Sequence, residues 1–125
     1  MGVFAHSFRA TVADEFAAVM QLGFDHRHVC IEQLDHYRRV HPDVLDPKPI
    51  IGGVLLRRHL RSEVVAAMET WWDHLVRYSR RDQLSVLVAL KEASLVPYVS
   101  SVDIRENDYW RWPASTGRRR RKFTK

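Results

Sequence analysis

The sequence predicts an α/β fold that is mostly helical, with about four helices and two or three strands. Four segments carry apolar residues at spacings of three and four, and two short runs read as strands. Their order is helix, helix, strand, helix, helix, strand, and 125 residues suit one modest domain. Because two strands make a poor sheet, we expect further strands, a partner that completes the sheet, or a larger fold.

The first two helices are predicted at residues 11–22 and 25–40. Thr11 can cap the first, Asp14 and Glu15 suit its first turn, and Gly23 is a natural stop. The second helix has one apolar face opposite a strongly polar one. That face consists of Val29, Cys30, Leu34 and Tyr37.

Three prolines within residues 41–49 indicate an extended connection. The next segment, "IIGGVLLRR" at 50–58, is predicted as a strand that is buried on both faces. Gly52 and Gly53 permit a bulge, or a close approach of a ligand to the backbone.

The third helix, 63–78, is predicted to begin after a Ser62 cap. Its apolar stripe consists of Val64, Val65, Met68, Trp71, Trp72, Leu75 and Tyr78, and we expect both tryptophans in the core. A fourth helix is predicted at 80–93, with Ser79 and Asp82 in a capping-box-like arrangement. Residues 96–104 read as the last strand.

Charge is distributed unevenly along the chain. The net charge of +5 comes from the segment "GRRRRKFTK", and the rest holds 14 basic against 15 acidic residues. We therefore predict a domain at 1–116 and a disordered basic tail at 117–125, which could contact nucleic acid or another anionic partner.

Other features of the sequence bear on location and on metal binding. The sequence has no run of about 18 apolar residues and no secretory signal, so we expect a cytoplasmic protein without a transmembrane segment. The lone Cys30 gives neither an internal disulfide nor a zinc site. The histidines complete no ligand set either, so no metal site is predicted.

Several segments carry a family resemblance. They are "AHSFRATVADEF" at 5–16, "IIGGVLLRRH" at 50–59 and "METWWDHLVRYSRRDQLSV" at 68–86. Over residues 4–92 the chain resembles the C-terminal half of a glycosyltransferase-like domain family, first catalogued as a domain of unknown function, from plants and bacteria. It departs from the family pattern at Ser7, where proline is usual, and at Val86, where an aromatic residue is usual.

The resemblance implies the acceptor-side half of a nucleotide-sugar-dependent transferase with a GT-A-like fold, acting in polysaccharide or glycan synthesis. Its implied partners are a nucleotide sugar and a glycan acceptor, with Mn²⁺ or Mg²⁺ in a complete enzyme. The sequence contains no DxD motif, so we expect this chain to be inactive alone. A non-catalytic binding or assembly module is the alternative, as a homo-oligomer or with a protein partner.

The segment "SRRDQLS" supplies the predicted catalytic residues, Asp82 and Gln83. They can be only a helix start, or they can face a cleft and bind sugar hydroxyls. Arg80 and Arg81 beside them could neutralise a diphosphate.

Further candidates for substrate binding come from two other segments. Arg57, Arg58 and His59 form either a solvated strand end or a ligand-facing one, with Gly52 and Gly53 upstream. His6 and Arg9, which match the resembling family's first motif together with Glu15, could bind phosphate or a carboxylated sugar. Trp110 and Trp112 could pack on the body or stack on a sugar ring.

Overall fold

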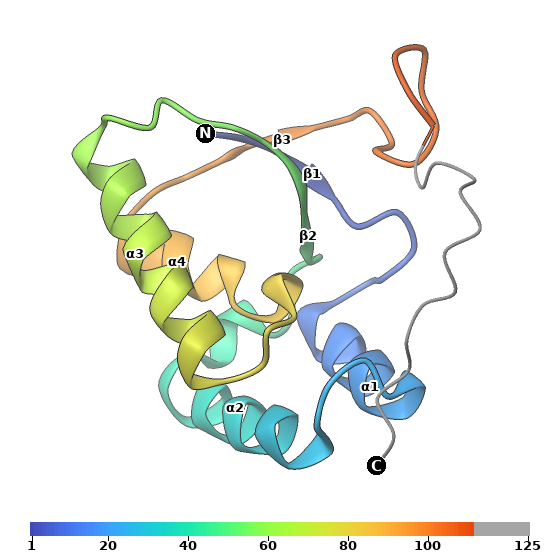
Figure 1. Cartoon of the computed structure of the whole chain (residues 1–125), viewed down its shortest axis with the longest axis vertical. Helices are drawn as coiled ribbons and strands as arrows, with labels where there is room; N and C mark the ends of the chain where they lie inside the picture. The colour runs from blue at the N-terminus through green and yellow to red at the C-terminus, as the bar shows by residue number, and fades with distance from the viewer. Residues whose placement is uncertain (112–125) are drawn as a thin grey trace.

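A three-stranded mixed sheet and four α-helices make up the part of the chain that the computed structural model describes, residues 1–111 (Figure 1). The strands lie at one end of the molecule and α2 at the other. The α/β, mostly helical prediction is confirmed. The elements are β1 (Gly2–Ala5), α1 (Val12–Leu22), α2 (Arg27–Val40), β2 (Ile50–Leu56), α3 (Ser62–Arg77), α4 (Val86–Glu92) and β3 (Tyr98–Ser100), with 3-10 turns at Pro42–Val44 and Asp82–Leu84.

The sheet has the order β2-β1-β3, so the strand that the sequence did not predict lies at its centre. β1 pairs antiparallel with β2 and parallel with β3. The register with β2 shifts between the Gly2–Leu56 and Phe4–Ile51 pairs, across the segment that holds Gly52 and Gly53. The third strand is thus supplied by the chain itself, and the glycine pair lies in an irregular stretch, as its composition allows.

The apolar run at 50–58 predicted a strand buried on both faces, and this prediction is wrong. β2 lies at an edge of the sheet, and Gly53 and Leu56 are exposed to solvent. A continuous apolar run fits a strand covered on two sides, but here no other part of residues 1–111 covers one side of part of the strand.

The first two helices form as predicted. The Thr11 hydroxyl accepts from the Asp14 backbone N–H, the Asp14 carboxylate accepts from the Thr11 N–H, and Gly23 ends the helix at a φ of 64°. In α2 the predicted inward face is buried at Cys30, Leu34 and Tyr37. Local capping therefore fixes α1, and an amphipathic face fixes α2.

Helix α3 differs from the prediction in its start and in one tryptophan. Ser62 is its first residue, and Arg61 precedes it without a side-chain cap. Trp71 is buried, but Trp72 has 65% of its surface exposed, so the expectation that both lie in the core is wrong. Both faces of this helix carry large apolar residues, and only one can face the sheet.

The helix predicted at 80–93 forms only in its second half, and the predicted Ser79 capping box is wrong. A 3-10 turn at Asp82–Leu84 comes first, and α4 spans only Val86–Glu92. Ser79 is buried and its hydroxyl donates to the Asp25 carboxylate at 2.7 Å. A buried partner from a distant part of the chain therefore prevails over local capping.

Two hydrophobic clusters form the core. One joins α1, α2 and the turn after α2 to the 3-10 turn at Asp82–Leu84 and to α4, around Phe16, Tyr37 and Leu84. The other joins the sheet to α3 and α4, around Val3 and Trp71. Leu87 packs against both clusters. No helix within residues 1–111 is long and apolar enough to span a membrane.

Candidate functional site

A cavity of about 310 Å³ lies where β1, α1, β2 and the turn before α4 meet. Segments far apart in sequence supply its walls, and many of the side chains are cationic or aromatic. The lining residues are His6, Phe8, Arg9, Glu15, Leu22, Phe24, Ile51, Arg81, Gln83 and Arg105. Four of the predicted site residues, His6, Arg9, Arg81 and Gln83, are thus brought together.

Glu15 is the buried carboxylate on the cavity wall, with 3% of its side chain exposed. Arg9 Nε donates to its Oε2 at 2.9 Å, and Arg81 Nη2 lies 3.9 Å from Oε1. Burial raises the pKa of Glu15, although the hydrogen bond and charge of Arg9 oppose this. With Arg105 on the rim, the positive charges outnumber Glu15 and favour an anionic ligand.

His6 is held in one orientation by the backbone that follows it. Its Nδ1 accepts from the N–H groups of Phe8, at 3.3 Å, and Arg9, at 3.1 Å. Burial, helped by the charges of Arg9 and Arg105, lowers the pKa of His6 to about 4. The ring is therefore neutral at pH 7, and because Nδ1 accepts, the proton is on Nε2, which points toward Glu15 at 3.9 Å.

The three guanidinium groups lie against aromatic rings. Arg9 and Arg105 lie 4.9 Å and 5.2 Å from the centre of the Phe8 ring, and Arg81 lies 5.2 Å from that of Phe24. Arg81 Nη2 also donates to the Gln83 side chain at 3.4 Å. Its Nε is buried and has no hydrogen-bond partner within residues 1–111. Stacked guanidinium groups bind planar or tetrahedral oxyanions with little loss of freedom.

Asp25, two residues before α2, fixes the turn that carries Arg81. Its carboxylate accepts from the Ser79 hydroxyl and, at 3.0 Å, from the Arg80 N–H. Burial alone would raise the pKa of Asp25, but these bonds and that from the His26 N–H keep it below its usual value. The side chain of Gln33 accepts from the Ser79 N–H at 3.3 Å. Hydrogen bonds to Asp25 and Gln33 therefore fix the position of this turn.

Asp82 does not line the cavity. Its carboxylate packs on β2 at Gly52, where an added Cβ would come within 2.0 Å of Oδ2. Trp71 Nε1 donates to the Asp82 carbonyl at 3.1 Å. Gly52 was predicted to allow either a bulge or a close approach of a ligand to the backbone. The group that approaches Gly52 closely is the Asp82 carboxylate.

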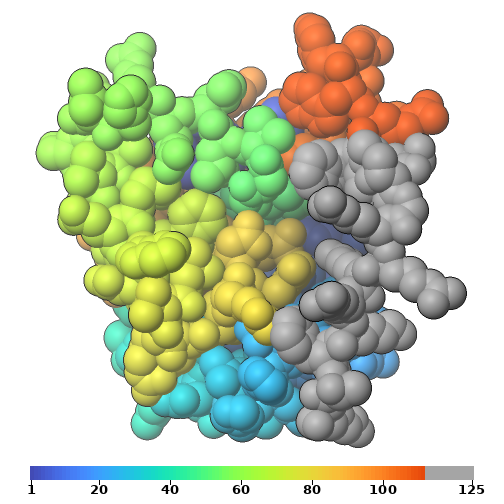
Figure 2. All heavy atoms as spheres, viewed as in Figure 1, coloured from blue at the N-terminus to red at the C-terminus, as the bar shows by residue number. Residues whose placement is uncertain are grey.

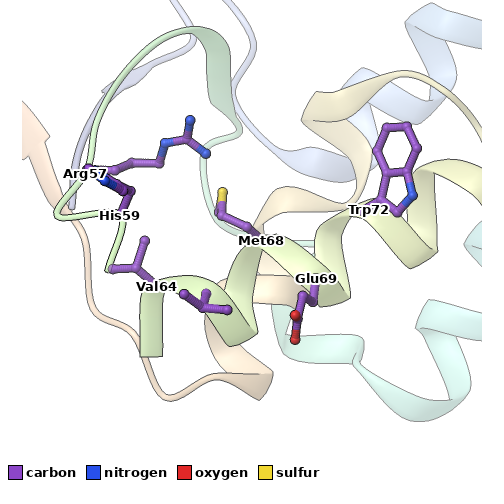
Figure 3. A pocket seen from close by; sticks show the side chains of 7 residues that line it. Arg57, His59, Val64, Met68, Glu69 and Trp72 are labelled. Atoms are coloured by element: carbon purple, nitrogen blue, oxygen red, sulfur yellow. The ribbon is translucent and has the colours of Figure 1, made fainter. Parts of the chain in front are cut away.

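Arg57 and His59 line a separate groove of about 360 Å³ on the outside of α3, together with Met68 and Trp72 (Figure 3). Arg58 lines neither cavity, Gly53 is exposed, and Arg80 extends toward Asp25, with its Nε 3.8 Å from the carboxylate. These residues are not brought to the cavity that holds His6 and Arg81.

The sequence reasoning missed Phe8, Phe24, Ile51 and Arg105 as cavity residues. None of them belongs to a recognisable spacing, and Arg105 follows β3, beyond the segments of the resemblance. Trp110 donates to the Ile104 carbonyl at 2.7 Å and meets the Phe4 ring edge-on, so it packs on the body. Trp112 and the basic tail lie outside the described residues.

The cavity residues do not fit a divalent metal. Glu15 is already paired with Arg9, and the cations around it would repel a metal ion. Within residues 1–111, no group of three His, Cys, Asp or Glu side chains is arranged to hold one.

Comparison with models of known protein families, with curated proteins and with solved structures finds no match to this chain.

Proposed function

We propose that this chain is a glycosyltransferase-like protein whose cavity binds the anionic part of a nucleotide sugar. It would be the acceptor-side portion of a transferase in polysaccharide or glycan synthesis. The observation that carries the proposal is the convergence of Arg9, Arg81 and Arg105 on one cavity beside Gln83. All three segments of the resemblance, 5–16, 50–59 and 68–86, contribute to its wall, which adds support.

The chemistry of the wall suits such a ligand. Arg81 and Arg105 have N–H groups for the oxygens of a diphosphate, which guanidinium groups bind in pairs. Gln83 can donate to and accept from sugar hydroxyls, and the neutral His6 donates through Nε2. Phe8 and Phe24 supply apolar surface for a sugar or a base.

In sugar transfer, an acceptor hydroxyl attacks the anomeric carbon and the diphosphate leaves. The arginines would stabilise the charge that builds up on that leaving group. Because the sequence has no DxD motif, we expect binding without turnover by this chain alone. Turnover by the purified chain would contradict that expectation, and binding without turnover in any context would favour the non-catalytic binding module.

Calorimetric titration tests the binding step. The probes are UDP-glucose, GDP-mannose, UDP and inorganic pyrophosphate, each with and without Mn²⁺. We expect at least one to bind and Arg81→Gln to weaken it at least about tenfold, since charge-assisted bonds are lost.

Arg58→Gln is the matched control, because Arg58 is an exposed arginine that lines neither cavity. We expect it to bind as the unmodified chain does. The proposal fails if no probe binds, or if the two arginine variants weaken binding equally while both stay folded by circular dichroism.

A further inference from the structure

The carboxylate on the wall of the cavity, Glu15, is already used by arginines and is poorly suited to a divalent metal. Its Oε2 accepts from Arg9 Nε at 2.9 Å, and Arg81 Nη2 lies 3.9 Å from its Oε1. A metal ion at Glu15 would have to break the bond to Arg9 and lie among guanidinium groups that repel it. The negative charge of the wall is therefore committed to the protein's own cations.

His6 presents the wrong ring nitrogen for a metal. A histidine that ligates a metal commonly donates the N–H of its other ring nitrogen to an acceptor. In His6 that other nitrogen, Nδ1, instead accepts from the backbone N–H groups of Phe8 and Arg9. A metal at Nε2 would force the ring proton onto Nδ1, where it would meet those two N–H groups. His6 is therefore a hydrogen-bond donor to a ligand through Nε2, and not a metal ligand.

Two arginines of the cavity keep donors that residues 1–111 leave largely unused. Arg81 Nη2 donates to Gln83 at a long 3.4 Å, and its buried Nε has no hydrogen-bond partner there. Within the same residues, Arg105 forms a hydrogen bond only through its backbone N–H, and its guanidinium group lies over the Phe8 ring. The charges of both arginines lower the pKa of His6, so both act on the same part of the wall. An oxyanion that accepts from them satisfies these donors.

Both arginines can be reached from solvent. Figure 2 shows the turn at Asp82–Leu84 at the molecular surface, with β2 on one side and the segment between α1 and α2 on the other. Arg81, next to that turn, has 24% of its side chain exposed, and Arg105 is exposed. A ligand can therefore contact both guanidinium groups without opening the core.

Charged groups just outside the cavity do not cancel these arginines. The Asp82 carboxylate packs on β2, and the Asp103 carboxylate accepts from the Ser7 hydroxyl and the Arg105 N–H, both at 2.8 Å. Lys48 adds a positive charge that acts on His6. The wall therefore keeps an excess of positive charge beyond the Arg9–Glu15 pair.

We propose that this cavity binds the diphosphate of its nucleotide sugar in the metal-free form, with Arg81 and Arg105 supplying the charge that a bridging divalent metal would supply. This rests on the proposed function and goes further by naming the form of the ligand. Each phosphate of the diphosphate carries negative charge, and the two guanidinium groups match the two phosphates. A diphosphate complexed by Mg²⁺ has lost most of that charge, and its metal ion would face the same arginines. Divalent metal therefore competes with the chain for the ligand.

Calorimetric titration of the full chain with UDP tests the competition. One series contains EDTA, a second contains enough Mg²⁺ to complex nearly all of the UDP, and a third contains EDTA with NaCl at the ionic strength of the second. The third series separates the effect of the metal from screening by salt. We expect the dissociation constant to be at least about tenfold higher with Mg²⁺ than with NaCl.

The outcomes separate this inference from the proposed function. Equal affinity in the Mg²⁺ and NaCl series, or binding that requires Mg²⁺, would overturn the metal-free form and leave nucleotide-sugar binding intact. If UDP, UDP-glucose, GDP-mannose and pyrophosphate all fail to bind in every series, the proposed function fails and this inference fails with it.

Arg105→Gln tests whether a guanidinium group takes the metal's role. We expect it to weaken UDP at least about fivefold in the NaCl series and by less in the Mg²⁺ series, so the ratio of the two dissociation constants falls. Arg58→Gln is the control, because Arg58 is exposed and lines neither cavity, and it should leave both constants unchanged. Circular dichroism checks that both variants fold. An unchanged ratio in Arg105→Gln would contradict the proposal.

Discussion

At the scale of single residues, His6 and Glu15 are two ionisable groups buried side by side on the cavity wall. Burial shifts their pKa values in opposite directions, in each case toward the neutral form. The histidine is held neutral, and the carboxyl group has its pKa raised by the same burial. Arg9 lowers the pKa of His6 further by repelling a proton, whereas its hydrogen bond and charge oppose the rise in the pKa of Glu15. The wall thus keeps its charge on the arginines over the pH range in which His6 would otherwise titrate.

This predicts a loss of stability on acidification that depends on His6. Its pKa is about 4 in the folded chain and 6.5 ordinarily, so the unfolded chain binds the proton more tightly. The His6 contribution is complete above pH 6.5 and is lost as the pH falls toward 4, by up to about 3 kcal/mol. Urea unfolding at a series of pH values measures it.

His6→Asn is the variant to compare, because the asparagine oxygen can accept the same two backbone N–H bonds. His74 also has its pKa lowered by burial and is unchanged in both chains, so the difference between them isolates His6. If the free energy of unfolding depended on pH in the same way in both chains, His6 would not be the source of the acid destabilisation.

At the scale of elements, the contact between β2 and the 3-10 turn depends on a missing side chain. We expect Gly52→Ala to lower the free energy of unfolding by about 1–3 kcal/mol, because the new methyl group overlaps the Asp82 carboxylate. In an Asp82→Ala background the same substitution should cost less. Thermal and urea unfolding of the four chains of this double-mutant cycle measure the coupling.

Gly53→Ala is the control for that cycle, since Gly53 is exposed in the same strand. We expect a change of about 0.5 kcal/mol or less there. Equal costs of Gly52→Ala with and without the Asp82 side chain would mean that the carboxylate is not what the methyl group meets.

The elements that the sequence predicts well are those with local causes. Thr11, Asp14 and Gly23 specify α1 within a dozen residues of one another, and all three act as predicted. Ser79 resembles a cap equally well in sequence, but its partner, Asp25, lies 54 residues away. Trp72 shows the same difficulty, because periodicity cannot say which of two apolar faces turns inward. Strand β1 has only four residues and leaves almost no pattern.

At the scale of the whole molecule, the site combines predicted and unpredicted residues. His6 and Arg9 share the cavity with Arg81 and Gln83, and all four were candidates that the sequence analysis took from separate segments. The contribution of Arg105 and the separation of Arg57 and His59 follow from the sheet order, which no local pattern encodes. Tertiary pairing therefore decides which predicted residues share a cavity.

The two core clusters should unfold together through Leu87. We expect Leu87→Ala to lower the free energy of unfolding by about 2 kcal/mol and to loosen the coupling between them. Native-state hydrogen exchange measures this: the best-protected amides of α1 and β1 should open with one free energy in the unmodified chain and with different ones in the variant. Leu75→Ala, which faces the second cluster, should lower both together. If α1 and β1 still opened with one free energy in Leu87→Ala, Leu87 would not be what couples the two clusters.

The central position of β1 determines when the sheet can form during synthesis. Residues 2–5 are synthesised before both strands that pair with them, since one partner strand is complete only at residue 56 and the other only at residue 100. The helices can form as they are synthesised, but one edge of the central strand stays unpaired until β2 is made and the other until β3 is made. A nascent chain stalled before residue 98 would therefore hold an unfinished sheet, and that is the stage at which a chaperone would find most to bind.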